Sequence, residues 1–209
     1  MLLFFFLLFD LILYPYIDHP GFRYYAFRAL GTIVILVSVY AISYRRSLLV
    51  FGLLLALPAV LHRILFLQAG AGTLPILNTI LSLGFNVFVV VIIFRHILSQ
   101  DRPSSETIFG AICIYLLFGF SFGSLYEMVV SIQPGALYLD PATNLHAMPD
   151  RFDCLYYSFG AMTALGTSGI TPVSNQMRSL TVIEAILGIL YLAVLISRLV
   201  AAYRIRHDA

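Results

Sequence analysis

Two apolar runs in the second half of the chain, at 107–132 and 179–203, are each long enough to cross a lipid bilayer as a helix. The whole chain is 61% hydrophobic and 11% charged, with a mean hydropathy of +0.96. No soluble fold could bury that much apolar surface, so the composition predicts an integral membrane protein. The formal net charge of +2, without any basic run, gives no indication of nucleic-acid binding.

Between these two runs lies a segment, Asp150–Pro172, whose character changes along its length. Its first part predicts a short amphipathic helix at 152–162. Asp150 is the expected N-cap, and Asp153 lies in the first turn, where the helix dipole favours negative charge. After Thr163 the residues become small and flexible. Non-helical backbone at membrane depth is tolerated only where protein buries it or where it lines a watery path. A helix that stops and returns as glycine-rich backbone is therefore typical of a pore loop.

The same segment resembles the pore region of tetrameric potassium-channel-like proteins, whose selectivity filter reads Thr-Val-Gly-Tyr-Gly followed by Asp. Without gaps, these six positions are taken by Ala164, Leu165, Gly166, Thr167, Ser168 and Gly169. The Ile-Thr-Pro at 170–172 matches the sequence often found directly after the filter in that family. When Thr163, the residue before these six positions, is included, the candidate filter spans 163–169. The resemblance is specific from about 152 to 203. Before that, hydropathy alone makes the chain resemble a bacterial family with four helices ahead of a pore unit.

The resemblance implies a cation pore in which rings of backbone carbonyl oxygens replace the water shell of the ion. The sequence contains one such loop and no evident internal repeat, so a pore would need four chains, a homotetramer in the lipid bilayer. The helix at 152–162 would point the negative end of its dipole at the cavity and stabilise a cation there. The permeant ion, potassium or sodium, is the only bound metal expected, at the filter carbonyls, and no cofactor is expected. The alternative for this segment is a small-residue turn that packs two helices together.

Departures from the family filter predict altered selectivity. Ser168 stands where the second filter glycine takes a left-handed conformation, which a side chain disfavours by about 1–2 kcal/mol. Gly169 follows it, so the backbone could turn one residue later. Thr167 is too short to replace the tyrosine that braces the family filter, and Ala164 removes the hydroxyl of the innermost ion site. We therefore expect a wider or less rigid filter that is weakly selective among monovalent cations, with a non-conducting pore as the alternative.

The last apolar run predicts an inner helix with a glycine in its interior. Gly188 lies where related channels often place a gating hinge. A glycine within a helix costs up to about 1 kcal/mol relative to alanine, and either bending or close helix packing would explain it. Glu184, one turn earlier, is expected to support the filter from behind; the alternative is that it faces external water.

One face of this inner helix is a candidate pore lining. By helical periodicity that face carries Ile189, Leu192, Ile196 and Val200. If it lines the pore, it forms an apolar constriction that gates by dewetting. Because every face of the helix is apolar, a lipid-facing or packing stripe is the alternative.

Further apolar runs precede this pore unit, at 2–16, 27–44, 48–67 and 74–97. A signal peptide is the alternative for the first run, but a basic start and a small-residue cleavage site are missing. The sequence thus predicts an all-α fold of six transmembrane helices, with a re-entrant pore helix and filter loop between the fifth and sixth. We expect a four-helix scaffold domain at 1–103 and a pore domain at 104–209.

Arginines at the ends of the spans predict the orientation of the chain. Those that fall on one side of a six-span arrangement are Arg45, Arg46, Arg95, Arg102, Arg204 and Arg206. The positive-inside rule makes that side cytoplasmic, with both termini inside. The fourth span has no arginine before Arg95, so a usual voltage sensor is not expected. Few residues follow Tyr203, so no soluble ligand-binding domain is expected on this chain.

The sequence therefore predicts passive conduction of monovalent cations across the cell membrane, and not an enzyme. The alternative is a transporter or membrane enzyme that uses scattered buried ionisable residues, Asp10, His62, Arg63 and Glu184. The chain has no His-Glu-x-x-His, Cys-x-x-Cys or Gly-x-Ser-x-Gly spacing and no pair of related halves, which disfavours both classes.

Overall fold

The structure is a computed structural model that describes 2–13, 52, 56–57, 74–98, 105–144, 146–167 and 169–207 of the chain. The expected span at 27–44 and most of the one at 48–67 lie outside the described residues. So does Ser168 of the candidate filter.

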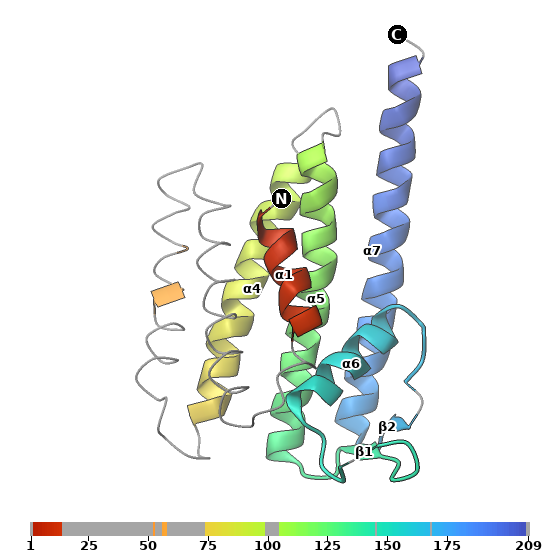
Figure 1. Ribbon diagram of the computed structural model, residues 1–209. Helices are drawn as coiled ribbons and strands as arrows, with labels where there is room; N and C mark the ends of the chain where they lie inside the picture. Colours follow the sequence, from red (N-terminus) through yellow and green to blue (C-terminus); the bar gives the residue numbers. More distant parts are fainter. Residues whose placement is uncertain are drawn as a thin grey trace. The chain divides into compact units, whose positions relative to one another are not determined.

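The described part of the chain is mostly helical (Figure 1). Its helices are α1 (Leu2–Leu13), α4 (Leu74–Leu98), α5 (Ser105–Ile132), α6 (Arg151–Met162) and α7 (Asn175–His207). Three stretches within them are long and apolar enough to cross a membrane, at Thr79–Ile97, Thr107–Ile132 and Asn175–Arg198, whereas α1 is a shorter apolar helix. These helices bear out the expectation of a membrane protein, while the count of six spans stays a prediction.

Two short strands depart from the all-helical expectation. β1 (Leu137–Leu139) pairs antiparallel with β2 (Ile170–Pro172), with Leu139 opposite Ile170 and Leu137 opposite Pro172. In β1, Leu137 and Leu139 are buried and Tyr138 between them is exposed, the alternation that a strand requires. A two-stranded sheet is marginal by itself, so its stability comes from the helices onto which its apolar face packs.

The chain divides into two compact units, 1–117 and 118–209, with the boundary inside α5. In the first unit, the Phe4 ring of α1 lies against Phe109 of α5, with centroids 5.5 Å apart. The expected division into a scaffold domain at 1–103 and a pore domain at 104–209 stays a prediction.

The second unit is built around one buried cluster where the helices and the small sheet meet. Its members are Phe122, Tyr126, Leu137, Leu139, Cys154, Tyr157, Ile170 and Met177. In Figure 1, α6 lies between α5 and α7 in this unit. Two glycines of α5 permit the close approach of α6: a Cβ at Gly119 would lie 2.5 Å from the Phe159 ring, and one at Gly123 would lie 3.2 Å from Leu155 Cα.

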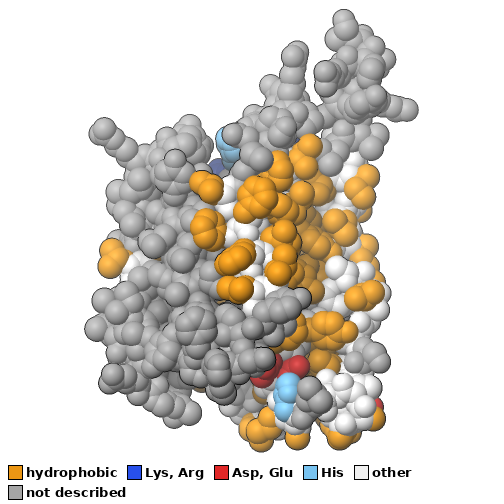
Figure 2. All heavy atoms as spheres, viewed as in Figure 1, with side chains coloured by type: hydrophobic (Ala, Val, Ile, Leu, Met, Phe, Trp, Pro, Cys, Tyr) orange, Lys and Arg blue, Asp and Glu red, His pale blue; other side chains and the backbone are white. Residues whose placement is uncertain are grey.

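On the face drawn in Figure 2, hydrophobic side chains cover most of the described surface. Acidic side chains lie with a histidine near one end of that face, and another histidine lies beside a basic side chain near the other end. An apolar surface of this kind suits lipid as the surrounding medium, since a soluble protein seldom exposes a large contiguous apolar patch.

Candidate pore region

The start of α6 is fixed by a reciprocal cap. The Asp150 Oδ1 atom accepts hydrogen bonds from the backbone N–H of Phe152, at 2.7 Å, and of Asp153, at 2.9 Å. In return, the Asp153 Oδ2 atom accepts from the backbone N–H of Asp150 at 2.8 Å. This capping box satisfies donors that the first helical turn would otherwise leave free. The expected N-cap and the acidic first turn are confirmed.

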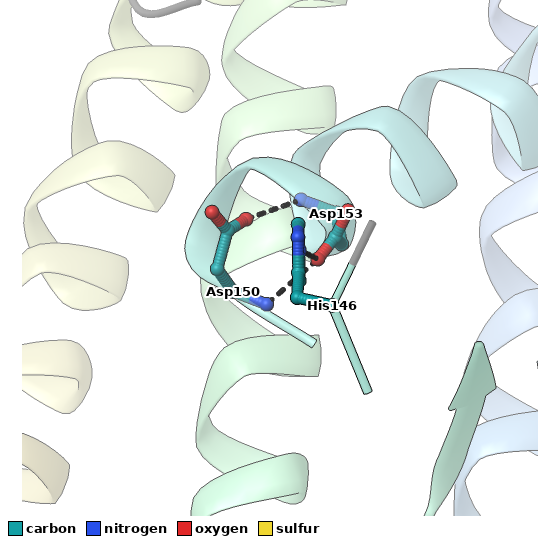
Figure 3. Close-up of side chains that lie close together, drawn as sticks. All are labelled: His146, Asp150 and Asp153. Carbon is teal, nitrogen blue, oxygen red and sulfur yellow. Dashed lines mark hydrogen bonds and ion pairs between the residues drawn. The ribbon is translucent and has the colours of Figure 1, made fainter. Parts of the chain in front are cut away.

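His146 joins this cap, as Figure 3 shows. Its Nε2 atom lies 2.8 Å from Asp153 Oδ2, and one ligand-type atom from each of His146, Asp150 and Asp153 lies within 4.8 Å of the others. One histidine and two carboxylates are a donor set that metals accept. However, both carboxylates already accept backbone N–H groups, of the N-cap or of the first turn of α6, and the positive end of a helix dipole disfavours a cation. Capping of α6 therefore explains why these three side chains lie together, and the cluster is not interpreted as a metal site.

At its other end, α6 stops and the chain reverses. The Thr163 N–H donates to Phe159 O at 3.0 Å, and the Gly166 N–H donates back to Gly160 O at 3.3 Å. Gly160 must be a glycine, because a Cβ there would overlap Thr167 Cγ2 and lie 3.2 Å from Gly166 O. The chain at 163–167 thus returns along the last turn of α6.

Several residues of this loop have a left-handed backbone. The φ angle is +55° at Ala164, +80° at Gly166 and +82° at Gly169. Gly169 therefore takes the left-handed conformation one position after Ser168, whose own geometry lies outside the described residues. At Ala164 the side chain makes that conformation costly, by about 1–2 kcal/mol. Strained backbone of this kind persists where the surrounding structure holds it and is often found at functional sites.

Thr167 and Leu165 face different surroundings within the loop. The Thr167 Oγ1 atom donates to Ile170 O at 3.0 Å, and the Ile170 N–H donates to Thr167 O at 3.3 Å, so the two residues close a turn. Leu165, in contrast, is 78% exposed in the single chain.

Glu184 of α7 lies behind α6 and is 1% exposed. Its Oε1 atom accepts a hydrogen bond from Ser158 Oγ of α6, and its Oε2 atom accepts one from the Tyr126 hydroxyl of α5, each at 2.5 Å. Ser158 Oγ also lies 2.8 Å from Gly119 O of α5. A single buried carboxyl group thus joins three helices, and in the single chain it does not face solvent.

A second polar contact lies one turn away from Glu184. The Tyr157 hydroxyl of α6 lies 2.8 Å from Thr181 Oγ1 of α7, and the Tyr157 and Tyr126 rings meet edge to face with centroids 5.1 Å apart. These aromatic rings pack beside the buried carboxyl group. We call Tyr126, Ser158 and Glu184, with Tyr157 and Thr181, the polar node.

Gly188 lies where the end of α6 rests on α7. A Cβ at this position would lie 2.6 Å from Met162 Cγ and 2.7 Å from Met162 O. α7 continues as one helix from Asn175 to His207 through this point. In this structure Gly188 therefore serves close packing of α6 on α7, and its use as a gating hinge stays a prediction.

The region that contains this geometry matches a known family. Residues 105–204, just under half of the chain, match the model of a family described as Ion channel. This stretch is similar to potassium-channel-type pore domains. The resemblance noted in the sequence is confirmed, and the family implies passive ion conduction across a membrane and favours a channel over an enzyme. No curated protein and no solved structure matches the chain significantly.

Within this channel-type region, the predicted pore-lining residues are exposed in the single chain. Ile189 is 56% exposed, Leu192 37% and Ile196 59%, while the side chain of Val200 lies outside the described residues. Other faces of α7 are exposed as well, for example at Ile186. Exposure alone does not select the face, so the lining stays a prediction.

Tyr126, Ser158 and Asn144 were not singled out from the sequence. A signal was available for the first two, because a buried carboxyl group on an apolar helix needs hydrogen-bond donors and hydroxyl groups on neighbouring helices supply them. For Asn144, which bonds to the end of the loop, no local signal exists.

Proposed function

We propose that four copies of the chain form a cation channel in the cell membrane, each with six spans, and that α6 and the loop at 163–169 are its re-entrant pore helix and filter. The observation that carries this proposal is the loop itself. Within the region that matches the channel family, a helix ends in non-helical backbone with repeated positive φ angles. At membrane depth such backbone is stable only against protein or a watery path.

The charge distribution around the loop favours a cation. The C-terminal end of α6 reaches the loop at Met162, and the partial negative charge of that helix end stabilises a positive ion nearby. Carbonyl groups of the loop supply the remaining ligands, as in other filters of this type. No cofactor beyond the permeant potassium or sodium ion is needed.

The polar node supports the filter from behind in this proposal. Glu184 ties Ser158 of the pore helix to Tyr126 of the outer helix, so the position of α6 is set by three helices together. The filter then depends on α6, because the Gly166 N–H bonds to Gly160 O.

Weak selectivity among monovalent cations follows from the small side chains of the loop. Thr167 bonds to Ile170 within the same turn, and Ala164 provides no hydroxyl group. The apolar residues Ile189, Leu192, Ile196 and Val200 form the constriction on the cytoplasmic side, where both termini lie, and Gly188 allows α7 to move there.

A flux assay on liposomes tests the proposal with a matched pair of glycine variants. Gly166 has a φ of +80°, so Gly166→Ala strains the loop backbone, whereas Gly84 of α4 has nothing within 4 Å of a new Cβ. We expect wild type and Gly84→Ala to release potassium, and Gly166→Ala to lower the flux about tenfold or more. Equal flux from both variants, or a monomeric mass of the purified protein, would contradict the proposal.

A further inference from the structure

The loop between α5 and α6, at 133–150, folds back onto the end of the candidate filter. We call it the α5–α6 loop. Its strand β1 pairs with β2, which directly follows Gly169, and the side chains of Leu139 and Ile170 anchor both strands in the buried cluster. The start of the loop is thus held against the helices of its own unit, so it can hold the filter in turn.

The contact between this loop and the filter is made by hydrogen bonds to one carbonyl group. Gly169 O accepts from the Asp140 N–H at 2.8 Å and from Asn144 Nδ2 at 3.0 Å. The Asn144 amide also donates to Asp140 O at 2.9 Å. Thr143 Oγ1 is a third acceptor, 3.1 Å from the same nitrogen, so three acceptors lie around the two amide protons, and the two carbonyl oxygens are the nearer ones.

Asp140 makes the part of the loop that carries Asn144 rigid. Its carboxylate accepts from the Ala142 N–H at 3.0 Å, and its carbonyl oxygen accepts from the backbone N–H groups of Thr143, at 3.1 Å, and Asn144, at 3.0 Å. Asn144 therefore approaches Gly169 from a tight turn that is closed on itself.

Gly169 accepts this approach because it has no side chain. A Cβ there would overlap Thr143 Oγ1, and the φ of +82° excludes most other residues independently. Among the described residues, the turn from Thr167 to Ile170 has two hydrogen bonds of its own, between Thr167 O and the Ile170 N–H and between Thr167 Oγ1 and Ile170 O, and the loop adds the bonds to Gly169 O.

We propose that Asn144 is a positioning residue for ion selectivity: it clamps the Gly169 carbonyl to the α5–α6 loop and so fixes the outer end of the filter. This inference rests on the proposed channel function. A carbonyl oxygen that already accepts two hydrogen bonds is a poor ligand for an ion, so Gly169 closes the filter rather than coordinating within it. Relaxing the clamp lets the preceding carbonyl groups move and changes which ion they fit.

The test compares Asn144→Asp with Gln133→Glu in the full chain. Each variant turns an amide into a carboxylate of equal size and adds one negative charge to the same loop. Only Asn144→Asp removes donors from Gly169, since Gln133 is exposed and its side chain bonds to none of the described filter residues. Asn144→Ala removes the donors without adding charge, and so separates the two effects.

The first readout is hydrogen exchange of the peptide at 136–144. We expect Asn144→Asp and Asn144→Ala to exchange about tenfold faster than wild type, the effect of one lost net hydrogen bond, and Gln133→Glu to match wild type. Unchanged exchange in both Asn144 variants would overturn the clamp, whether or not the protein conducts.

The second readout is the sodium-to-potassium permeability ratio from the reversal potential. We expect a change of about twofold or more in the Asn144 variants, and none in Gln133→Glu. A purely structural role would lower the amount of assembled channel and leave this ratio unchanged, which would overturn the selectivity role. A wild-type protein that carries no current would contradict the proposed function, while the exchange result would still decide on the clamp.

Discussion

The two ends of the candidate filter loop are held by different kinds of contact. At the α6 end, Met162 packs on Gly188 and Ser158 bonds to Glu184, all of them buried between helices. At the other end, Gly169 is held by main-chain and amide hydrogen bonds from a partly exposed loop. Side chains packed in a buried site tolerate little change in their volume, whereas in an exposed hydrogen bond water can replace either partner. The α6 end is thus built for rigidity, and the Gly169 end is the part that a change in the loop can adjust.

Glu184 is where the largest effect is expected, because its loss removes the buried carboxyl group that Ser158 and Tyr126 share and opens a cavity. Glu184→Ala should lower the free energy of unfolding by about 2–4 kcal/mol. Glu184→Gln keeps the volume, accepts from Tyr126 and donates to Ser158, so its cost should stay below about 1.5 kcal/mol. Thermal unfolding of the purified protein in detergent measures both. Equal stability of the two variants would show that the polar node is not a structural support.

Gly188→Ala should have the next largest effect. The new Cβ lies 2.7 Å from Met162 O, a backbone atom that cannot move without moving α6. Overpacking of this kind costs about 1–3 kcal/mol, although alanine recovers up to about 1 kcal/mol of helix propensity. The matched control is Gly84→Ala, which meets nothing within 4 Å. If the two variants unfold at the same temperature, Gly188 does not serve close packing.

Tyr126→Phe separates one hydrogen bond of the polar node from its packing. The ring stays, and only the donor to Glu184 Oε2 is lost, so the expected cost is about 1 kcal/mol. Tyr156→Phe is the control, since Tyr156 lies on α6 and is 42% exposed. If Tyr126→Phe lowers the free energy of unfolding no more than the control does, then packing alone, and not this hydrogen bond, supports α6.

Arg151→Gln should have the smallest effect, because it breaks an exposed contact. Arg151 Nη1 lies 3.6 Å from Glu127 Oε2, and both side chains are more than one-third exposed, at 35% and 39%. Surface ion pairs of this geometry contribute roughly 0.5 kcal/mol or less and weaken with salt. A loss above 1 kcal/mol at high salt, on the order of a buried contact, would contradict the distinction between buried and exposed contacts on which the comparison rests.

The parts of the second unit that the sequence predicted are those determined locally. The apolar runs produce α5 and α7, and Asp150 with Asp153 marks the start of α6 at its true position. The small residues after Thr163 end that helix, because glycine and alanine leave the reversed backbone room to pack on Gly160.

The parts that could not be predicted depend on residues far apart in the chain. Tyr126 and Glu184 are separated by 58 positions, and Asn144 and Gly169 by 25. The pairing of β1 with β2 is set by burial of Leu139 and Ile170 in the shared cluster, which short strands do not reveal by themselves. For Gly188, bending and packing require the same residue, so only the position of Met162 distinguishes them.

The central claim is that the loop at 163–169 forms the filter of a cation pore. Planar-bilayer recording of the purified protein, with potassium on one side and sodium on the other, tests it most directly. Currents that reverse near zero would support a cation pore with a relaxed filter, and Gly166→Ala should abolish them. Reversal at the potassium potential would contradict the weak selectivity, and currents that Gly166→Ala leaves unchanged would contradict the claim that this loop is the filter.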